Sequence, residues 1–96
     1  MIVVRVELRS PAGADAYARM TAGMNRVGFS RTVSREDGTR FKLPTGEFRF
    51  AGDASVSLTN ARDLAAAAVR GVQGDFGLLA MRVEEWTSVG LKVKVP

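Results

Sequence analysis

Arginine and lysine are the residues of this sequence whose chemistry is most apparent. The 96-residue chain has fourteen of them against ten aspartates and glutamates, which gives a formal net charge of +4 and an isoelectric point near 10.3. Most are arginine, whose planar fork of donors suits phosphate groups and base edges, whereas lysine acts as a hydrated point charge. This balance is compatible with an acidic partner such as nucleic acid, and also with an ordinary basic surface.

The residue types that are missing exclude most catalytic sites. Without histidine or cysteine, the chain has no Ser-His-Asp or Cys-His nucleophile, no histidine general base and no thiolate or histidine metal site. It also lacks the glycine-rich fingerprints of dinucleotide and nucleoside triphosphate sites. Glu84 and Glu85 are adjacent, but neighbours on a strand point to opposite faces. We therefore predict no metal site and no cofactor.

RNA cleavage does not strictly require histidine. A 2′-hydroxyl held in line with its phosphate, together with arginine donors that stabilise the developing charge, lowers the barrier by positioning and electrostatics. The same surface would serve plain binding, so the residues leave open whether the protein is an enzyme. An RNA-recognition motif is not indicated, because Phe41, Phe48 and Phe50 alternate with charged residues as core residues do.

The first half of the chain predicts a strand and a helix. Residues 2–9 alternate, which indicates a strand with one buried face made of Ile2, Val4, Val6 and Leu8. Residues 12–27 predict a helix, with Ser10 as N-cap, Pro11 at its first position and Gly28 at its C-terminal end. The apolar stripe of this helix comprises Ala16, Tyr17, Met20, Gly23, Met24 and Val27. The single tyrosine is thus predicted to be a core residue.

Residues 28–50 predict a β-hairpin that organises the rest of the chain. Its turn is Asp37-Gly38, because this pair readily takes the positive φ values of a tight turn. Pro44 cannot donate a ladder hydrogen bond, and Gly46 allows a kink. We therefore interpret residues 39–50 as one bent strand or two short ones.

The second half predicts another helix and more strand. Ser57 or Thr59 caps the helix, whose predicted stripe is Leu58, Ala61, Leu64, Ala65, Ala68 and Val72. Residues 78–86 indicate a strand with Leu79, Met81 and Val83 on one face. Residues 89–95 alternate as well, and are the candidate for a fifth strand on the sheet edge.

The order of elements is therefore β-α-β-β-α-β, which predicts an α+β fold of the ferredoxin-like type, with an antiparallel sheet and two helices on one face. We expect residues 1–96 to form a single ferredoxin-like domain. The other face of the sheet would be bare. It is predicted to carry Arg5, Glu7, Arg9, Arg40, Lys42, Arg49 and Arg82.

Three sequence segments carry a resemblance to a known family. They are Gly-Phe-Ser-Arg-Thr-Val-Ser from Gly28, Asp-Gly-Thr from Asp37, and Leu-Pro-Thr-Gly-Glu-Phe from Leu43. The sequence resembles small bacterial and phage-borne proteins associated with antitoxin endoribonucleases of the GhoS type. The resemblance implies a ferredoxin-like fold that is often homodimeric, similar to the small CRISPR adaptation nucleases. It also implies an activity on RNA, since the antitoxin members cut the messenger RNA of a small membrane toxin.

The predicted nucleic-acid-binding residues are all basic. Arg19 and Arg26 on the outer face of the first helix, and Arg31 beyond it, are the first positions where we expect RNA contact or cleavage. The full candidate set is Arg5, Arg9, Arg19, Arg26, Arg31, Arg40, Lys42 and Arg49. No catalytic residue is assigned.

The leading hypothesis is a homodimeric protein that binds or cleaves single-stranded RNA through an arginine-rich surface. The alternative is a non-catalytic phage or mobile-element protein that docks its sheet or edge strand on a protein partner and inhibits it. No signal-like N-terminal run and no apolar stretch of about 18 residues occurs, so we expect a cytoplasmic location and no membrane insertion.

Overall fold

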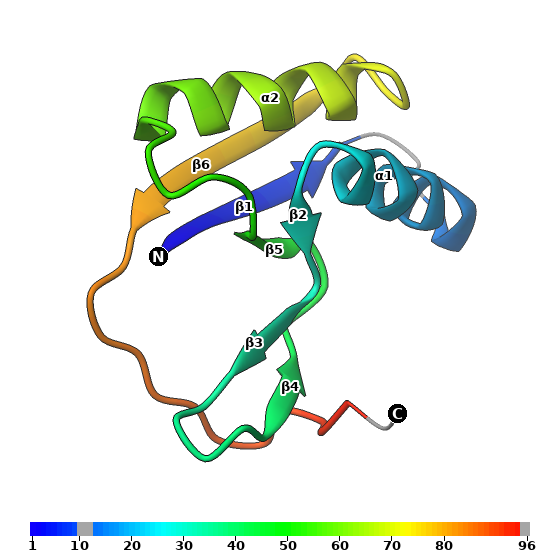
Figure 1. The fold of residues 1–96 in the computed structure, drawn as a ribbon. Coiled ribbons are helices and arrows are strands. Elements are labelled where there is room, and N and C mark those ends of the chain that lie inside the picture. The colour runs from blue at the N-terminus through cyan, green and yellow to red at the C-terminus, as the bar shows by residue number, and fades with distance from the viewer. Residues whose placement is uncertain (10–12, 95–96) are drawn as a thin grey trace.

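A four-stranded antiparallel sheet carries two helices on one face. The computed structural model describes residues 1–9 and 13–94. The central strand β1 (Ile2–Leu8) lies between β5 (Glu47–Phe50) and β6 (Phe76–Arg82), and β2 (Phe29–Ser30) pairs with the outer side of β5. The sheet order is therefore β2-β5-β1-β6, with every neighbouring pair antiparallel (Figure 1). The predicted ferredoxin-like α+β fold is confirmed.

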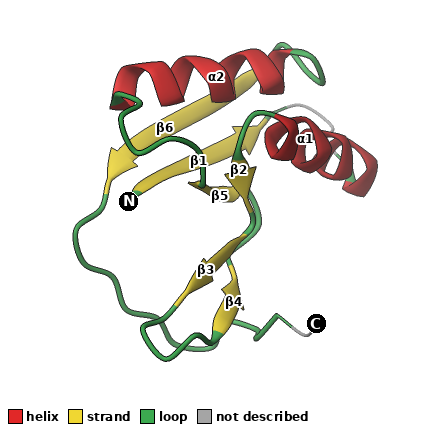
Figure 2. Cartoon of the chain, viewed as in Figure 1, coloured by secondary structure: helices red, strands yellow, loops and turns green. Residues whose placement is uncertain are grey.

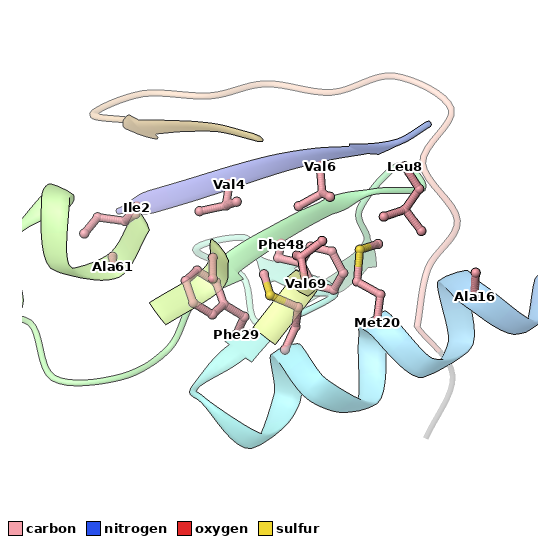
Figure 3. Packing of buried hydrophobic residues seen from close by; sticks show 12 residues of the cluster. Ile2, Val4, Val6, Leu8, Ala16, Met20, Phe29, Phe48, Ala61 and Val69 are labelled. Carbon is pink, nitrogen blue, oxygen red and sulfur yellow. The ribbon is translucent and has the colours of Figure 1, made fainter. Parts of the chain in front are cut away.

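Helices α1 (Ala14–Arg26) and α2 (Leu58–Arg70) lie on the same side of this sheet (Figure 2). Side chains of a strand alternate between its faces, so the even-numbered residues of β1 meet the helices. Figure 3 shows this core in detail, where Val4, Met20 and Phe48 are fully buried. The buried cluster consists of Ile2, Val4, Val6, Leu8, Ala16, Met20, Met24, Phe29, Phe48, Ala61, Ala65 and Val69. Tyr17 packs against this cluster from outside, as predicted for a core residue.

The two helices begin differently. Ser57 is the N-cap of α2, and its side-chain oxygen accepts a hydrogen bond from the backbone N–H of Asn60 at 3.0 Å. Gly13 is the N-cap of α1 and supplies no side-chain cap, while the predicted cap at Ser10 and Pro11 lies outside the described residues. The predicted end of α1 is confirmed at Gly28, where φ is +96° and the N–H donates to the carbonyl of Asn25.

The predicted hairpin is confirmed as two short strand pairs. Strand β3 (Thr32–Ser34) pairs with β4 (Arg40–Lys42) in a separate two-stranded sheet, which extends away from the helices and the main sheet (Figure 1). Its turn is a three-residue loop, because the Arg35 carbonyl accepts from Gly38 N–H and the Arg35 N–H donates to Thr39. Gly38 has a φ of +88°, and the Thr39 N–H bond lowers the pKa of Asp37.

One residue of the predicted α2 face and the predicted faces of β6 are wrong. The α2 face packs on the core as predicted except for Leu64, which is 40% exposed, and Val69, which was not predicted, is buried beside Ala61 and Ala65. In β6, Leu79 is 57% exposed on the face away from the helices, while Arg82 pairs with Ile2 and lies on the helix side. Residues 78–81 are apolar throughout, so their alternation carries no information about faces, and the pairing with β1 decides them.

The bare face of the main sheet is also smaller than predicted. Arg5 and Glu7 lie there, and Arg49 joins them through its pairing opposite Val3. Arg40 and Lys42 do not, because the chain bends between β4 and β5 and places them on the separate small sheet. Residues 89–94 of the candidate fifth strand form no strand. Val93 alone makes an isolated bridge, with Phe41 of β4, and none with the main sheet among the described residues. Over residues 1–9 and 13–94, no helix is long and apolar enough to cross a membrane.

Gly46 sits at this bend and tolerates no side chain. Its φ is +85°, and a Cβ atom added there would lie 2.5 Å from the carbonyl oxygen of Val6, which is much closer than real Cβ contacts. The Gly46 carbonyl also accepts a hydrogen bond from the Val6 N–H at 2.8 Å. The bend is therefore attached directly to the central strand.

We expect Gly46→Ala to lower the free energy of unfolding by at least about 2 kcal/mol, because it combines a left-handed φ with a backbone clash. Gly38→Ala is the matched control. It has the same sign of φ but no atom within 4 Å of its Cβ position, so it should cost only about 1 kcal/mol. Urea denaturation measures both. Equal costs for the two variants would show that the contact with Val6 does not matter.

Candidate nucleic-acid interface

The eight predicted basic residues do not form one surface. Arg5, Arg9 and Arg19 each have a carboxylate partner: Glu47 at 2.5 Å, Asp75 at 3.4 Å and Asp15 at 3.0 Å, respectively. Exposed ion pairs of this kind add little stability, but they do partly neutralise the charge that a phosphate would meet. These three residues are separated on the strand face, the end of β1 and the outer side of α1.

Arg26 lies alone at the last turn of α1, where a positive charge interacts favourably with the helix dipole. It is exposed, and no ion pair to it occurs among the described residues. The favourable interaction with the helix end accounts for an arginine at this position, and no ligand is needed to explain it.

Arg31 holds the bend between β4 and β5. Its guanidinium donates to the carbonyl oxygens of Leu43 at 2.8 Å, Pro44 at 2.5 Å and Glu47 at 2.7 Å. It also lies over the ring of Phe48, 5.5 Å from the ring centre. Burial lowers the pKa of the Arg31 guanidinium, while the Glu47 carboxylate acts in the opposite direction. Its donors are thus occupied by the backbone of this chain.

Thr32 anchors the two remaining arginines of the predicted set. Arg40 donates to its hydroxyl oxygen at 2.9 Å, and Arg49 donates to its carbonyl oxygen at 3.0 Å. The Thr32 hydroxyl also lies 3.0 Å from that of Ser30. One donor of the exposed Arg40 is thus fixed within the small sheet, whereas Arg49 links β5 of the main sheet to β3 of the small sheet.

Residues 92–94 lie beside β4 of the small sheet through an isolated bridge. The Lys42 N–H donates to the Lys92 carbonyl and the Lys94 N–H donates to the Arg40 carbonyl, each at 2.8 Å. With Phe41 opposite Val93, this register places Lys92 opposite Lys42 and Lys94 opposite Arg40. All four cations share one face, since strand residues two apart point the same way. We call Arg40, Lys42, Lys92 and Lys94 the basic face.

The basic face is exposed and unneutralised. All four residues are exposed, and none forms an ion pair with a carboxylate among residues 1–9 and 13–94. The remaining positions on this face are the hydroxyl residues Thr32 and Ser34, opposite Lys42 and Arg40. Thr32 is buried, so the face offers positive charges and the exposed hydroxyl group of Ser34, and no aromatic ring for base stacking.

The sequence prediction missed Lys92 and Lys94, although their alternation with Val93 indicated a strand. The signal that would have found them is that lysine is rare in this chain. The chain has three lysines, Lys42, Lys92 and Lys94, and the structure brings all three onto the basic face.

The opposite face of the small sheet is apolar. Val33 is buried there, and Phe41 lies under the guanidinium of Arg35 at 5.7 Å. A groove of about 330 Å³ opens beside it, between the start of β1 and the C-terminal segment. Its lining includes Met1, Val3, Leu43, Pro44, Trp86 and Leu91.

A second, polar cleft of about 510 Å³ lies at the hairpin tip. It is lined by Glu36 and Asp37 from the tip and by Glu84 and Glu85 from the segment after β6. Within the described part of the chain, no three carboxylates come together in a geometry that could hold a metal ion. The cleft is therefore acidic and repels the phosphates that the basic face attracts.

The basic face can bind phosphate groups, and it contains no histidine or carboxylate that could act as a general base, since the chain has no histidine. Comparison with known proteins adds no relative, because no protein-family model and no curated protein matches the chain.

Arg31→Met is expected to lower the free energy of unfolding by about 2–3 kcal/mol, because the loss of a charged donor leaves partly buried carbonyl groups without partners. Arg31→Lys should recover only part of this loss, since an ammonium cannot reproduce the planar fork. Arg26→Met is the control for charge and size, and should cost less than about 1 kcal/mol. Urea denaturation gives all three values. A fully stable Arg31→Lys variant would contradict the assigned geometry.

Proposed function

We propose that this protein is a cytoplasmic RNA-binding protein that holds single-stranded RNA on the basic face by its phosphates. The observation that carries this proposal is the convergence of four cations without a carboxylate partner from β4 and from a segment about 50 residues further along the described chain, as in Lys42 and Lys92. Like charges directly opposite one another on a sheet are destabilising. A polyanion that binds both would remove this cost.

The spacing of the basic face suits an extended strand. Arg40 and Lys42 are two residues apart along β4, about 6.7 Å from one another, a distance comparable to one extended nucleotide. The absence of an aromatic residue on this face disfavours recognition by base stacking, and the lysines do not make the bidentate base contacts that arginine makes. Binding by the phosphates should therefore be largely independent of sequence.

The resemblance to antitoxin endoribonucleases of the GhoS type supports the same class of ligand. An activity of that type would need a correctly positioned 2′-hydroxyl and stabilisation of the phosphate by the cations, since the basic face has no general base. We propose RNA binding as the primary function. The experiment that measures binding also detects cleavage of the RNA.

We expect wild-type protein to bind an oligouridine of about 20 nucleotides with an affinity that falls about 50-fold between 50 mM and 200 mM salt, as four phosphate contacts to a single strand require. Arg40→Gln with Lys42→Gln should halve the logarithmic salt slope, from about −2.8 to about −1.4. Fluorescence anisotropy measures both, and electrophoresis of the same samples detects cleavage.

The matched control is Arg62→Gln with Arg82→Gln. It also removes two positive charges, but from α2 and from the end of β6. This variant should keep the wild-type salt slope. An equal loss in both double variants would show that net charge, and not the basic face, determines binding. No binding at 50 mM salt would overturn the proposal and favour the alternative, a protein partner that occupies the apolar groove beside Trp86.

We also propose that the protein forms a homodimer through β6. This strand is a sheet edge with seven residues, and Leu79 is 57% exposed on it. A long apolar edge is a template for another strand, and the only charged residue of β6 is Arg82, so two antiparallel copies bring no like charges together near Leu79.

Light scattering coupled to gel filtration is expected to give twice the chain mass for the wild type. Leu79→Arg should give the monomer mass, because it places two charges beside each other at the centre of the joined edge. Leu64→Arg, at a 40% exposed position on α2, is the control and should remain dimeric. A monomeric wild type would remove the dimer from the proposed function and leave the RNA site unaffected.

A further inference from the structure

The segment that supplies half of the basic face is weakly attached. We call residues 83–94 the C-terminal strap. It leaves β6 at Val83, whose N–H donates to the Met1 carbonyl at 2.6 Å, and its next backbone bonds to the rest of the described chain are those of Lys92 and Lys94 to β4. Figure 1 shows its long course, from orange to red, between the main sheet and the hairpin.

Little apolar surface fixes the strap to the domain. Val89 is 97% exposed and Val93 is 53% exposed, and the apolar side chains of the strap that line the groove are Val83, Trp86, Val89 and Leu91. The bridge between Val93 and Phe41 is isolated, so the strap gains none of the cooperativity of a longer ladder.

The charges of the strap oppose its docking. When it lies on β4, Lys92 comes opposite Lys42 and Lys94 comes opposite Arg40, and each pair is destabilising without an anion nearby. The two hydrogen bonds that dock the strap thus compete directly with two repulsive pairs. A balance of this kind responds to whatever neutralises the charges.

We propose that docking of the C-terminal strap and binding of the RNA backbone are coupled, so that the RNA completes its own site. This inference rests on the proposed function, and names the regulation of that site. With the strap docked, the ligand meets four cations, and with the strap detached it meets only Arg40 and Lys42. A ligand shifts an equilibrium by its difference in affinity for the two states, and each process promotes the other by the same factor.

The coupling makes a specific prediction about salt. Salt screens repulsion between exposed charges, so in the absence of RNA the strap should dock more firmly as salt increases. Most surface interactions between a protein and a polyanion weaken under the same change. The strap and the RNA are therefore expected to respond to salt in opposite directions.

Hydrogen exchange of the strap and the emission of Trp86 report docking. Trp86 is the single tryptophan of the chain and lines both the groove and the polar cleft from the strap. We expect exchange at residues 84–94 to slow, and the Trp86 emission to shift to shorter wavelength, when salt is raised or when oligouridine is added at low salt. The Lys92→Gln, Lys94→Gln variant should give the slow exchange already at low salt, with no response to salt.

A reversible cross-link tests the reciprocal effect. The chain has no cysteine, and Phe41 and Val93 form a pair flanked by the two strap hydrogen bonds, the position in which Cα atoms lie closest. Phe41→Cys with Val93→Cys should, when oxidised, bind oligouridine about three- to tenfold more tightly at low salt than the same variant when reduced, because RNA binding no longer has to drive the docking of the strap.

Different outcomes would overturn the coupling of the strap and the proposed RNA binding. Exchange of the strap that is the same at low and high salt, while oligouridine still binds, would overturn the coupling and leave the proposed function standing. Equal affinity of the oxidised and reduced variants would overturn it as well. No binding of oligouridine to any form would overturn the proposed function itself, and with it the role of RNA in docking the strap.

Discussion

The three hydrogen bonds from Arg31 to the backbone of the bend are the interaction on which the rest of the functional surface depends. In a plain ferredoxin-like sheet, the second and third strands would continue as one hairpin. Here the chain turns at Pro44 and Gly46, and one guanidinium donates to three carbonyl groups of this turn, of which that of Pro44 also accepts from the Glu47 N–H. Because the bend is also bonded to Val6, β3 and β4 are held at a fixed direction away from the helices. The small sheet can therefore receive residues 92–94 beside β4.

The basic face is a site where stability and function conflict. The fold would be more stable with opposite charges or neutral residues at the cross-strand positions, since paired like charges cost free energy. The acidic side chains near the hairpin tip, including Glu36 and Glu84, line a separate cleft and neutralise none of the four cations in the described chain. Such a segregation of charge keeps the basic face available to an external anion.

The fold was predictable from the sequence because its signals are local. The alternation in β1, the glycine after α1, the Ser57 cap and the turn before Gly38 each identify an element within a few residues. The buried and exposed faces of β6 could not be predicted, since four consecutive apolar residues show no alternation. The register of β6 with β1 determines which residues face the helices. The site was predicted only in part for the same reason. Lys92 joins Lys42 through a bridge between distant segments, and Arg31 was assigned to a ligand although the backbone of the bend uses it.

Arginine and lysine occupy different kinds of position in this protein, and this difference supports the basic face as the binding site. Arginines act where a planar fork has a fixed partner: Arg31 on the bend, Arg5 on Glu47 and Arg49 on Thr32. The three lysines, in a chain with eleven arginines, all lie where the side chain faces water and another cation. A flexible ammonium moves away from a like charge more easily than a hydrogen-bonded guanidinium does. It also follows a phosphate that has no fixed position. Lysine at these positions thus permits both a detached strap and a ligand bound through its backbone, whereas arginine would favour one rigid arrangement.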